Sequence, residues 1–360
     1  MHRRSFLKAA GLAAAAPLSA NPMDIKLGLD SYSIRAFQWK AMQLLDYTAS
    51  LKLDTIQLSS LNDYESLEPA HLAQVKDHAA RLGVRIDAGT GCICPTSASY
   101  NHEKQGDPTA YLLQSLKVAH AVGSSSMRCY MGSAADRRGS LPLEAHMQST
   151  VKVLRSVRAR ALDLGIKIGL ENHAGDMQAR EVKTIIEEAG RDFVGSCLDS
   201  GNPMWVLEDP FVTLETLAPY VVTTHIRDSA VFEVPQGAAA QWVALGDGSV
   251  DFVAFVEKYR RLCPHAAMQL EIITGRPPQI LPYLDPDFWK YFRQMPAWEF
   301  ARFLALAKKG HPYIGPMVIG GEGKQPPAIE AALKEQQRAD LERSLEYAKK
   351  KLNVGVRWRS

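Results

Sequence analysis

The sequence lacks the patterns that identify several common protein classes. Its 360 residues contain no run of 18 or more apolar residues, so we expect no membrane-spanning helix. There are only five cysteines, an odd number that leaves at least one thiol unpaired. No Gly-x-Ser-x-Gly motif is present, which gives no support to a serine hydrolase. Hydrophobic residues make up 46% of the chain, which indicates a large folded core and excludes disorder for most of it.

The first twenty residues have the pattern of an export signal. Arg3 and Arg4 precede a Phe-Leu-Lys sequence and the short apolar run Ala9–Leu18, and small residues follow up to Ala20. This pattern resembles a twin-arginine signal, with cleavage after Ala20 and a periplasmic or secreted product. The alternative, an amphipathic helix, would need a polar face that this segment does not show. Cleavage would remove three of the 42 basic residues and none of the 39 acidic ones, leaving no net charge. A neutral mature chain has no general attraction for nucleic acid, and no such partner is expected.

Residues 21–360 are predicted to form one α/β domain. A short apolar run, a turn and a helical stretch alternate along it, and the apolar runs lack the polar alternation of one-sided strands, as buried parallel strands do. Eight such units predict a closed (βα)8 TIM barrel. An open doubly wound sheet is the alternative, but no Gly-rich phosphate loop follows the first run. The eight predicted strands are 25–30, 55–59, 84–88, 126–131, 166–171, 194–199, 221–226 and 267–272.

Residues 276–321 interrupt this alternation with seven prolines and many aromatic residues. The segment follows the eighth predicted strand and therefore starts at the end of the barrel where active sites lie. Two interpretations are open: an apolar wall or lid over a ligand, or an extension that packs on the outside of the barrel. From Pro327 the sequence predicts a C-terminal helix, because Leu341, Leu345 and Leu352 share one face.

The last four predicted strands all end in residues that bind metals. Glu171, Asp199, His225 and Glu271 stand at these four ends, which converge at one end of a barrel. A single acid at such a position is commonly a helix cap or part of a salt bridge. Three carboxylates buried together, however, require a compensating cation. Three oxygen ligands and one imidazole suit one divalent ion, Mn²⁺, Mg²⁺ or Co²⁺ in preference, with Zn²⁺ or Fe²⁺ as further options.

The motifs around these residues resemble those of the sugar phosphate isomerase/epimerase family, which has a xylose isomerase-like barrel. The resemblance implies that one divalent ion is held by Glu171, Asp199, His225 and Glu271. It also implies that the two glutamates move protons on either side of the carbon next to a ketose carbonyl, through a metal-stabilised enediolate. The motifs are Glu171-Asn172-His173, Asp199-Ser200-Gly201-Asn202-Pro203, His225-Ile226-Arg227-Asp228, Leu245-Gly246-Asp247-Gly248-Ser249-Val250-Asp251-Phe252 and Leu270-Glu271.

The sequence departs from the family pattern at two positions. Tagatose-type ketose epimerases have a histidine three residues after the aspartate ligand, where this chain has Asn202. Many members end their second strand with glutamate, where this chain has Gln57. Asn202 can hydrogen-bond a sugar hydroxyl but does not titrate. Both departures weigh against the ordinary ketose 3-epimerase reaction.

Three further residues are candidates for substrate binding. His173 follows Glu171 by two residues and would act as a base or a hydroxyl donor, or alternatively cap the next helix. Arg227 shares a strand face with His225, so it would contact substrate or form a salt bridge with a neighbouring carboxylate. Arg128 lies at the end of the fourth predicted strand and completes the candidate set.

The predicted function is that of a metal-dependent isomerase or epimerase of a small carbohydrate. Export favours an unphosphorylated sugar, because phosphosugars are mainly cytoplasmic. A 3-keto-glycoside lyase or hydratase is the alternative, since it begins with the same proton abstraction. A sugar-binding protein without turnover is a third hypothesis. An apurinic-site endonuclease shares the barrel but has further His and Asp ligands, which are not found on the earlier strand ends, such as Asp87-Ala88.

Overall fold

The computed structural model describes residues 25–321 and 323–359. The predicted export signal at residues 1–20 therefore lies outside the described residues. No helix of the described chain is both long enough and apolar enough to cross a bilayer.

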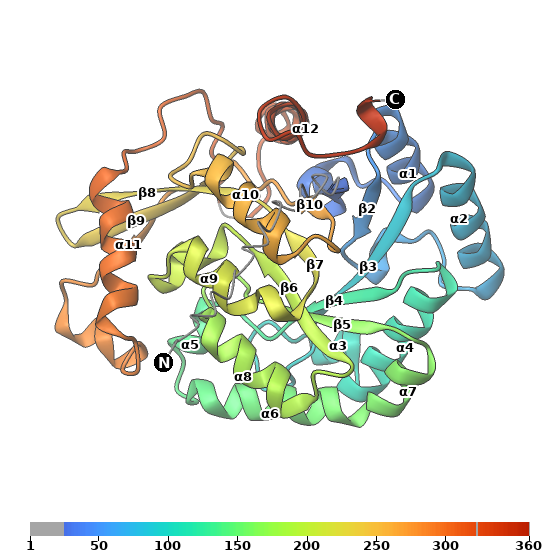
Figure 1. The fold of residues 1–360 in the computed structure, drawn as a ribbon, viewed down its shortest axis with the longest axis horizontal. Helices are drawn as coiled ribbons and strands as arrows, with labels where there is room; N and C mark the ends of the chain where they lie inside the picture. Colours follow the sequence, from blue (N-terminus) through green and yellow to red (C-terminus); the bar gives the residue numbers. More distant parts are fainter. Residues whose placement is uncertain (1–24, 322, 360) are drawn as a thin grey trace, which may run out of the picture.

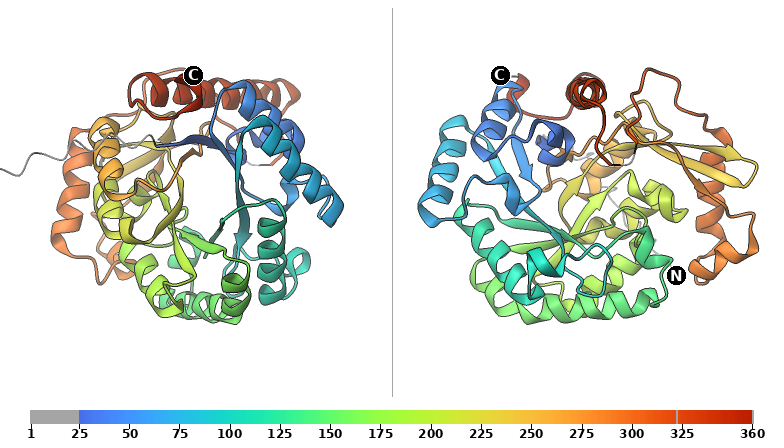
Figure 2. Two further views of the ribbon diagram at one scale, coloured as in Figure 1. Left: turned by 45° about the vertical axis from the view of Figure 1, so that its right-hand side comes forward. Right: turned by 180° about the vertical axis from the view of Figure 1, so that it is seen from behind.

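Eight parallel strands form the predicted TIM barrel (Figures 1 and 2). The last strand pairs with the first, and a bridge between Ile226 and Leu270 joins the last two along the chain. The third strand extends to Cys92, beyond the predicted end at residue 88, whereas the last strand is shorter than predicted. The strands are β1 (Leu27–Asp30), β2 (Thr55–Leu58), β3 (Arg85–Cys92), β4 (Ser126–Tyr130), β5 (Lys167–Glu171), β6 (Val194–Asp199), β7 (Val221–His225) and β10 (Met268–Leu270).

Helices surround the barrel because each presents one apolar face to the strands. In α8, Val182, Ile185, Ile186 and Ala189 are buried at helical spacing. The predicted C-terminal helix is present as α12, whose residues Leu341 and Leu345 are buried. The helices are α1 (Ala41–Ser50), α2 (Pro69–Leu82), α3 (His102–Gln105), α4 (Pro108–Ala121), α5 (Ala134–Arg137), α6 (Leu143–Ser156), α7 (Arg158–Asp163), α8 (Ala179–Ala189), α9 (Pro210–Leu217), α10 (Phe252–Leu262), α11 (Ala297–Lys309) and α12 (Pro327–Lys350).

A second, three-stranded sheet stands beside the barrel and was not predicted. After β7 the chain forms the antiparallel hairpin β8 (Asp228–Val234) and β9 (Gly237–Val243), and β11 (Gln279–Leu281) adds to β9. Helix α11 packs on β8, and Figure 1 shows this group to the left of the barrel. The aromatic residues of 276–321 largely contact one another there; Tyr283, for example, packs edge-on against Phe300. Apart from Arg276, which lines the cavity described below, the segment therefore extends the accessory sheet on the outside of the barrel.

The Leu-Gly-Asp-Gly-Ser-Val motif after β9 is tied to this hairpin by one carboxylate. Asp228 is fully buried and accepts hydrogen bonds from the backbone N–H groups of Ser229, Gly246, Gly248 and Val250, at 2.8 to 3.4 Å. Burial raises the pKa of Asp228 to about 7, although these four donors lower it. The geometry of the loop thus depends on a single side chain at the start of β8.

Candidate metal centre

The four predicted ligands meet at the carboxyl end of the barrel. Glu171 ends β5, Asp199 ends β6, His225 ends β7 and Glu271 follows β10. One ligand atom from each lies within 4.8 Å of those of the other three. The first three side chains are fully buried and Glu271 is 5% exposed. Their convergence follows from the parallel strands, whose carboxyl ends lie at the same end of the barrel.

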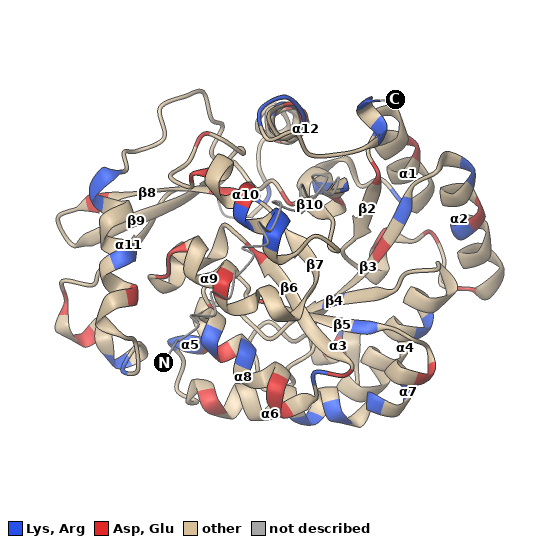
Figure 3. Cartoon of the chain, in the orientation of Figure 1, with Lys and Arg blue, Asp and Glu red and all other residues tan. Residues whose placement is uncertain are grey.

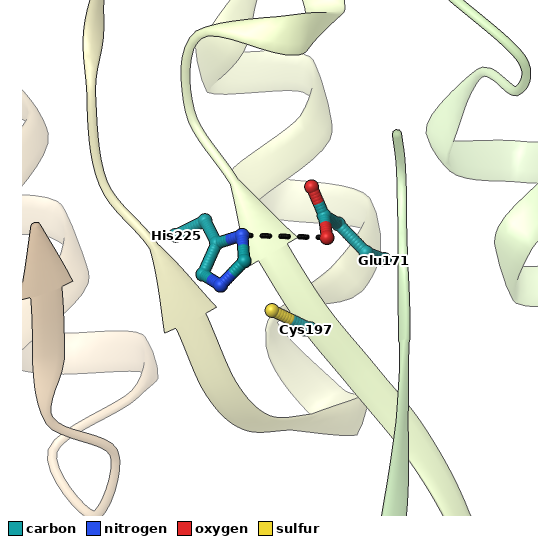
Figure 4. Close-up of side chains that lie close together, drawn as sticks. All are labelled: Glu171, Cys197 and His225. Carbon is teal, nitrogen blue, oxygen red and sulfur yellow. Dashed lines mark ion pairs between the residues drawn. The ribbon is translucent and has the colours of Figure 1, made fainter. Parts of the chain in front are cut away.

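The His225 ring has one nitrogen directed at the carboxylates. Nδ1 lies 3.3 Å from Oε2 of Glu171 and 3.3 Å from Oε2 of Glu271, and the contact with Glu171 is drawn in Figure 4. Within the described chain Nδ1 is buried without a hydrogen-bond partner. On the other side of the ring, Nε2 lies 3.2 Å from Oδ2 of Asp30 and contacts Gln57. With an ion bound, a proton on Nε2 held by Asp30 would leave the Nδ1 lone pair facing the ion, and this arrangement fits a divalent ion. Without an ion, burial lowers the pKa of His225 but the neighbouring acidic groups outweigh it and raise the value well above its ordinary range, so the ring is then positively charged.

A second set of donors overlaps with the first. Cys197 lies two residues before Asp199 on β6, and its sulfur, Glu171 and His225 also form a compact group (Figure 4). Burial raises the pKa of the Cys197 thiol well above its ordinary value. A protonated thiol is a poor ligand, because metals bind the thiolate. The four-residue set with three carboxylates is therefore the better donor set.

Two buried arginines neutralise much of the acidic charge. Arg227 forms ion pairs with Asp199 and with Glu271, the latter at 2.8 Å between Nη1 and Oε2. Arg128 donates from Nε to Oε2 of Glu171 at 2.5 Å and from Nη1 to the carbonyl of Thr90 at 3.0 Å. Both arginines were predicted to contact substrate. They line the cavity described below, but in this structure they form salt bridges, which for Arg227 was the alternative considered.

The pKa values of the carboxylates depend on burial, which raises them, and on the neighbouring positive charges, which lower them. Burial raises the pKa of Glu271, but Arg227 and His225 outweigh it and lower the value to about 2. For Glu171 the charges of Arg128 and His225 likewise overcome burial, and the pKa lies well below its ordinary range. Burial dominates at Asp199, whose pKa is raised to about 6 although Arg227 lowers it. All three side chains are therefore predominantly ionised near pH 7.

His173 and Asn202 take different positions around the centre. His173 Nδ1 lies 2.6 Å from the carbonyl of Gly132, a donation that leaves Nε2 as an acceptor, and the ring stacks on Tyr130 at 4.0 Å. Burial lowers the pKa of His173, so the ring is mostly neutral at pH 7. Asn202 donates from Nδ2 to the carbonyl of Asn172 at 2.9 Å and to Oε1 of Glu171 at 3.3 Å. Asn202 thus supports a ligand, and it does not line the cavity.

A cavity of about 500 Å³ opens beside the four ligands. Four of its lining residues, Arg128, His173, Arg227 and Glu271, were predicted from the sequence, whereas the others that matter chemically were not. Trp242 of β9 stacks on Trp205 at 4.4 Å between ring centroids, and the Arg227 guanidinium lies 5.0 Å from the Trp242 ring centroid. If residues 228–243 had been predicted to form a hairpin, Trp242 would have been placed at this end of the barrel. The missed polar and aromatic lining residues are Tyr32, Ser59, Ser60, Asn62, Ser99, Asn101, Lys104, Gln105, Tyr111, Tyr130, Trp242 and Arg276.

Basic and acidic residues alternate over the outer helices. In Figure 3 both colours occur on α2, α6, α7 and α8, and no large area of one sign is visible from this side. The chemically distinctive charges of the described chain are therefore those inside the barrel.

Comparison with known proteins agrees with this architecture. The chain is 27% identical over 251 residues to the 3-oxo-isoapionate decarboxylase of Pectobacterium atrosepticum, covering 65% of this chain and 80% of that protein. It resembles the structure of a D-psicose 3-epimerase in the presence of D-fructose, with a TM-score of 0.59 and 15% identity over 91% of this chain and 99% of that one. The 3-keto-D-glucoside 4-epimerase of E. coli has a TM-score of 0.53 and 15% identity, covering 75% of this chain and 100% of that one.

The relatives named here are enzymes, in agreement with the isomerase- or epimerase-like enzyme expected from the sequence. At these identities the two structural similarities establish the shared fold. A family model describing the xylose isomerase-like TIM barrel matches residues 45–279, more than half of the chain. The chain therefore belongs to the xylose isomerase-like TIM barrel family.

Proposed function

We propose that the protein is a divalent-metal-dependent isomerase or epimerase of a small carbohydrate. The observation that carries this proposal is the group of three buried carboxylates and one unpartnered imidazole nitrogen beside a cavity of about 500 Å³. Such a cavity accommodates a monosaccharide. The family and the epimerases of the same fold support the reaction class.

Glu171, Asp199, His225 and Glu271 would hold the ion. Three carboxylates favour Mn²⁺, Mg²⁺ or Co²⁺, although Zn²⁺ and Fe²⁺ accept the same donors. When bound, the ion would supply positive charge that stabilises the enediolate formed next to a carbonyl.

The remaining chemistry is assigned to the chain's own residues. Glu271 lines the cavity, is ionised at neutral pH, and would remove the proton from the carbon beside the carbonyl. Glu171, which is also ionised, would take a proton from water and return it on the other side, and Glu271 would release its proton to water, so that no net proton is gained or lost. His173, with Nε2 free to accept, would orient a hydroxyl group or relay a proton. Arg128 and Arg227 hold the two glutamates in place and offset the charge that develops.

A lyase is the second candidate function. Loss of a proton and loss of CO₂ from the carbon beside a carbonyl leave related carbanions, which the same residues would stabilise. In a 3-keto-glycoside, the carbanion formed by proton loss would then expel the glycosidic oxygen, with its bonding electrons, from the next carbon. The relative that is 27% identical is named a decarboxylase, which favours this class. The 3-keto-glycoside lyase or hydratase reaction predicted as an alternative belongs here as well.

The test compares substrates on metal-loaded protein. Metal content is first measured by mass spectrometry after growth with Mn²⁺, Mg²⁺, Co²⁺ or Zn²⁺. Ketoses and a 3-keto-glycoside are then incubated in D₂O. An epimer carrying deuterium supports the isomerase or epimerase, whereas released aglycone supports the lyase. Binding without deuterium incorporation or product from any of these sugars would favour a sugar-binding protein.

We also propose that the protein is exported through a twin-arginine-type signal. Arg3 and Arg4 support this proposal, and export would favour an unphosphorylated substrate. Cell fractionation and mass spectrometry of the mature N-terminus test it. Replacement of both arginines by lysine should retain the protein in the cytoplasm, and cleavage after Ala20 should disappear.

A further inference from the structure

The cations that line the cavity form two groups, and only one group has acidic partners. Arg128 and Arg227 are buried and paired with the metal-ligand carboxylates. Lys104 and Arg276 are exposed at the opening of the cavity, and the described chain offers neither of them an ion pair. Glu271 is the one acidic residue among the lining residues of this cavity in the described chain.

The charges of the buried groups around the metal centre balance without the cations at the opening of the cavity. Four buried carboxylates surround the centre, those of Glu171, Asp199 and Glu271 and that of Asp30 behind His225. Two arginines and one divalent ion would supply four positive charges against them. The positive charges of Lys104 and Arg276 are therefore not needed to neutralise these four carboxylates. Asp63 is a further acid nearby. Its carboxylate accepts hydrogen bonds from the Ser31 hydroxyl and the Ser60 backbone N–H, and it does not line the cavity.

A third arginine adds to the positive potential at the opening. Arg35 donates from Nη1 to the carbonyl of Tyr32 at 3.0 Å and lies 4.3 Å from the Tyr32 ring centroid, and Tyr32 lines the cavity. Burial lowers its pKa most; Tyr32 and Glu271 raise it, and the charges of Arg276 and Arg227 lower it, a sign that the three guanidinium groups lie near one another and near Glu271. The backbone of Arg276 is anchored by Gln241, which donates from Nε2 to its carbonyl at 2.9 Å. Cations gathered without an acidic partner attract an anion.

We propose that the substrate is a sugar acid whose carboxylate binds Arg276 at the opening of the cavity, with Lys104 and Arg35 contributing charge. The planar guanidinium matches a carboxylate with two parallel hydrogen bonds. A phosphate site in a barrel commonly uses backbone N–H groups at a helix N-terminus. Residues 271–278, which carry Arg276, contain no helix and lead directly into β11. This inference rests on the proposed function, because it names the substrate class of the same site.

Binding measurements separate this inference from the question of turnover. Titration calorimetry on metal-loaded protein would compare D-fructose with two acids of the same skeleton, D-fructuronate and 2-keto-D-gluconate, and with D-fructose 6-phosphate. We expect at least one acid to bind about tenfold more tightly than D-fructose or better. Added NaCl, from about 20 to about 500 mM, should weaken binding of the acid and leave that of D-fructose unchanged.

Two arginine variants make the test specific. R276Q should lose about tenfold in affinity for the acid and change that for D-fructose less than twofold. R293Q, at an exposed arginine outside this cavity, should change neither. Equal binding of acid and neutral sugar, absence of binding by both acids, or tighter binding of the phosphate with the same R276Q loss would each overturn the inference. An acid that binds through Arg276 without deuterium exchange or product would instead contradict the proposed reaction and leave the inference standing.

Discussion

The two halves of the barrel contribute different groups to the same centre. Strands β5, β6, β7 and β10 supply the three carboxylates and the imidazole that would hold the ion. Strands β1, β2 and β4 supply Asp30, Gln57 and Arg128, which contact those ligands. All four candidate ligands therefore come from one half of the barrel. Asp30, Gln57 and Arg128 support them from the other half, in addition to Arg227 and Asn202 on the ligand half, so the support from the second half can be tested separately by substitution.

The largest effect is expected on the half of the barrel that carries the ligands. Glu271→Gln keeps the size of the side chain but removes the carboxylate that takes the proton. Turnover of metal-loaded protein should fall by about 10²- to 10⁴-fold. Glu233→Gln, at an exposed glutamate of β8, serves as the matched control and should keep full turnover. Full turnover by Glu271→Gln with metal bound would show that this glutamate does not move the proton.

The support from the second half is tested next, through the charge on Arg128. Arg128→Met leaves Glu171 buried without its closest cation. The free energy of unfolding without added metal should fall by about 3–5 kcal/mol, as measured by chemical denaturation. Saturating Mn²⁺ should recover part of this loss, because the ion then compensates Glu171. Arg158→Met breaks an exposed ion pair with Asp192 and should cost less than about 1 kcal/mol.

A smaller effect is expected where the second half orients the imidazole. Asp30→Asn weakens the acceptor that faces Nε2 of His225. The affinity for Mn²⁺, measured by titration calorimetry, should fall by about 10- to 100-fold. Asp63→Asn changes a neighbouring carboxylate that does not contact His225 and is the control. Unchanged affinity in Asp30→Asn would mean that the ring is held by Gln57 and by packing alone.

The smallest effect concerns a buried carboxylate that has no cation beside it. Glu208 accepts hydrogen bonds from Thr213 and from the backbone of Ala179, and burial raises its pKa to about 8, whereas Glu271 beside Arg227 has a pKa of about 2. Because the pKa in the folded chain lies above the ordinary value of 4.5, the folded state holds an additional proton between these pH values. Its contribution to stability is complete below about pH 4.5 and is lost as the pH rises through about 8.

In Glu208→Gln the free energy of unfolding should therefore decline less steeply between about pH 5 and about pH 8, by at most about 1.4 kcal/mol per pH unit. Chemical denaturation across this range measures the slope. Glu257→Gln, at an exposed position of α10, should keep the slope of the parent protein. An unchanged slope in Glu208→Gln would mean that Glu208 is ionised in the folded chain over this pH range.

The barrel and the convergence of the four candidate metal ligands were predictable because both depend on local patterns. Apolar runs at regular intervals identified all eight strands, and the acid or histidine at the end of each of the last four identified the centre. The predicted ends were least accurate where the hydrophobic pattern was weak, as in β3, whose last residues are small or polar up to Cys92.

The accessory sheet and the cavity lining were not predictable in the same way. The hairpin strand β9 contains three consecutive alanines and has no strong strand pattern, so Trp242 was missed. The pairing of Arg128 with Glu171 depends on side-chain directions across neighbouring strands, which the order of residues does not specify. Lys104 and Arg276 are 172 positions apart in the chain, and only the folded barrel brings both to the lining of one cavity.

The accessory hairpin has a consequence for how this family changes its substrates. Its two ends are adjacent in space, since Asp228 and Val243 face each other in the register of β8 and β9. A hairpin whose ends meet can be lengthened, shortened or exchanged in evolution without moving the barrel strands on either side. Because β9 carries Trp242 into the cavity, such an exchange would replace one wall of the binding site and keep all four metal ligands. Substrate range and reaction chemistry would then evolve on separate parts of the chain.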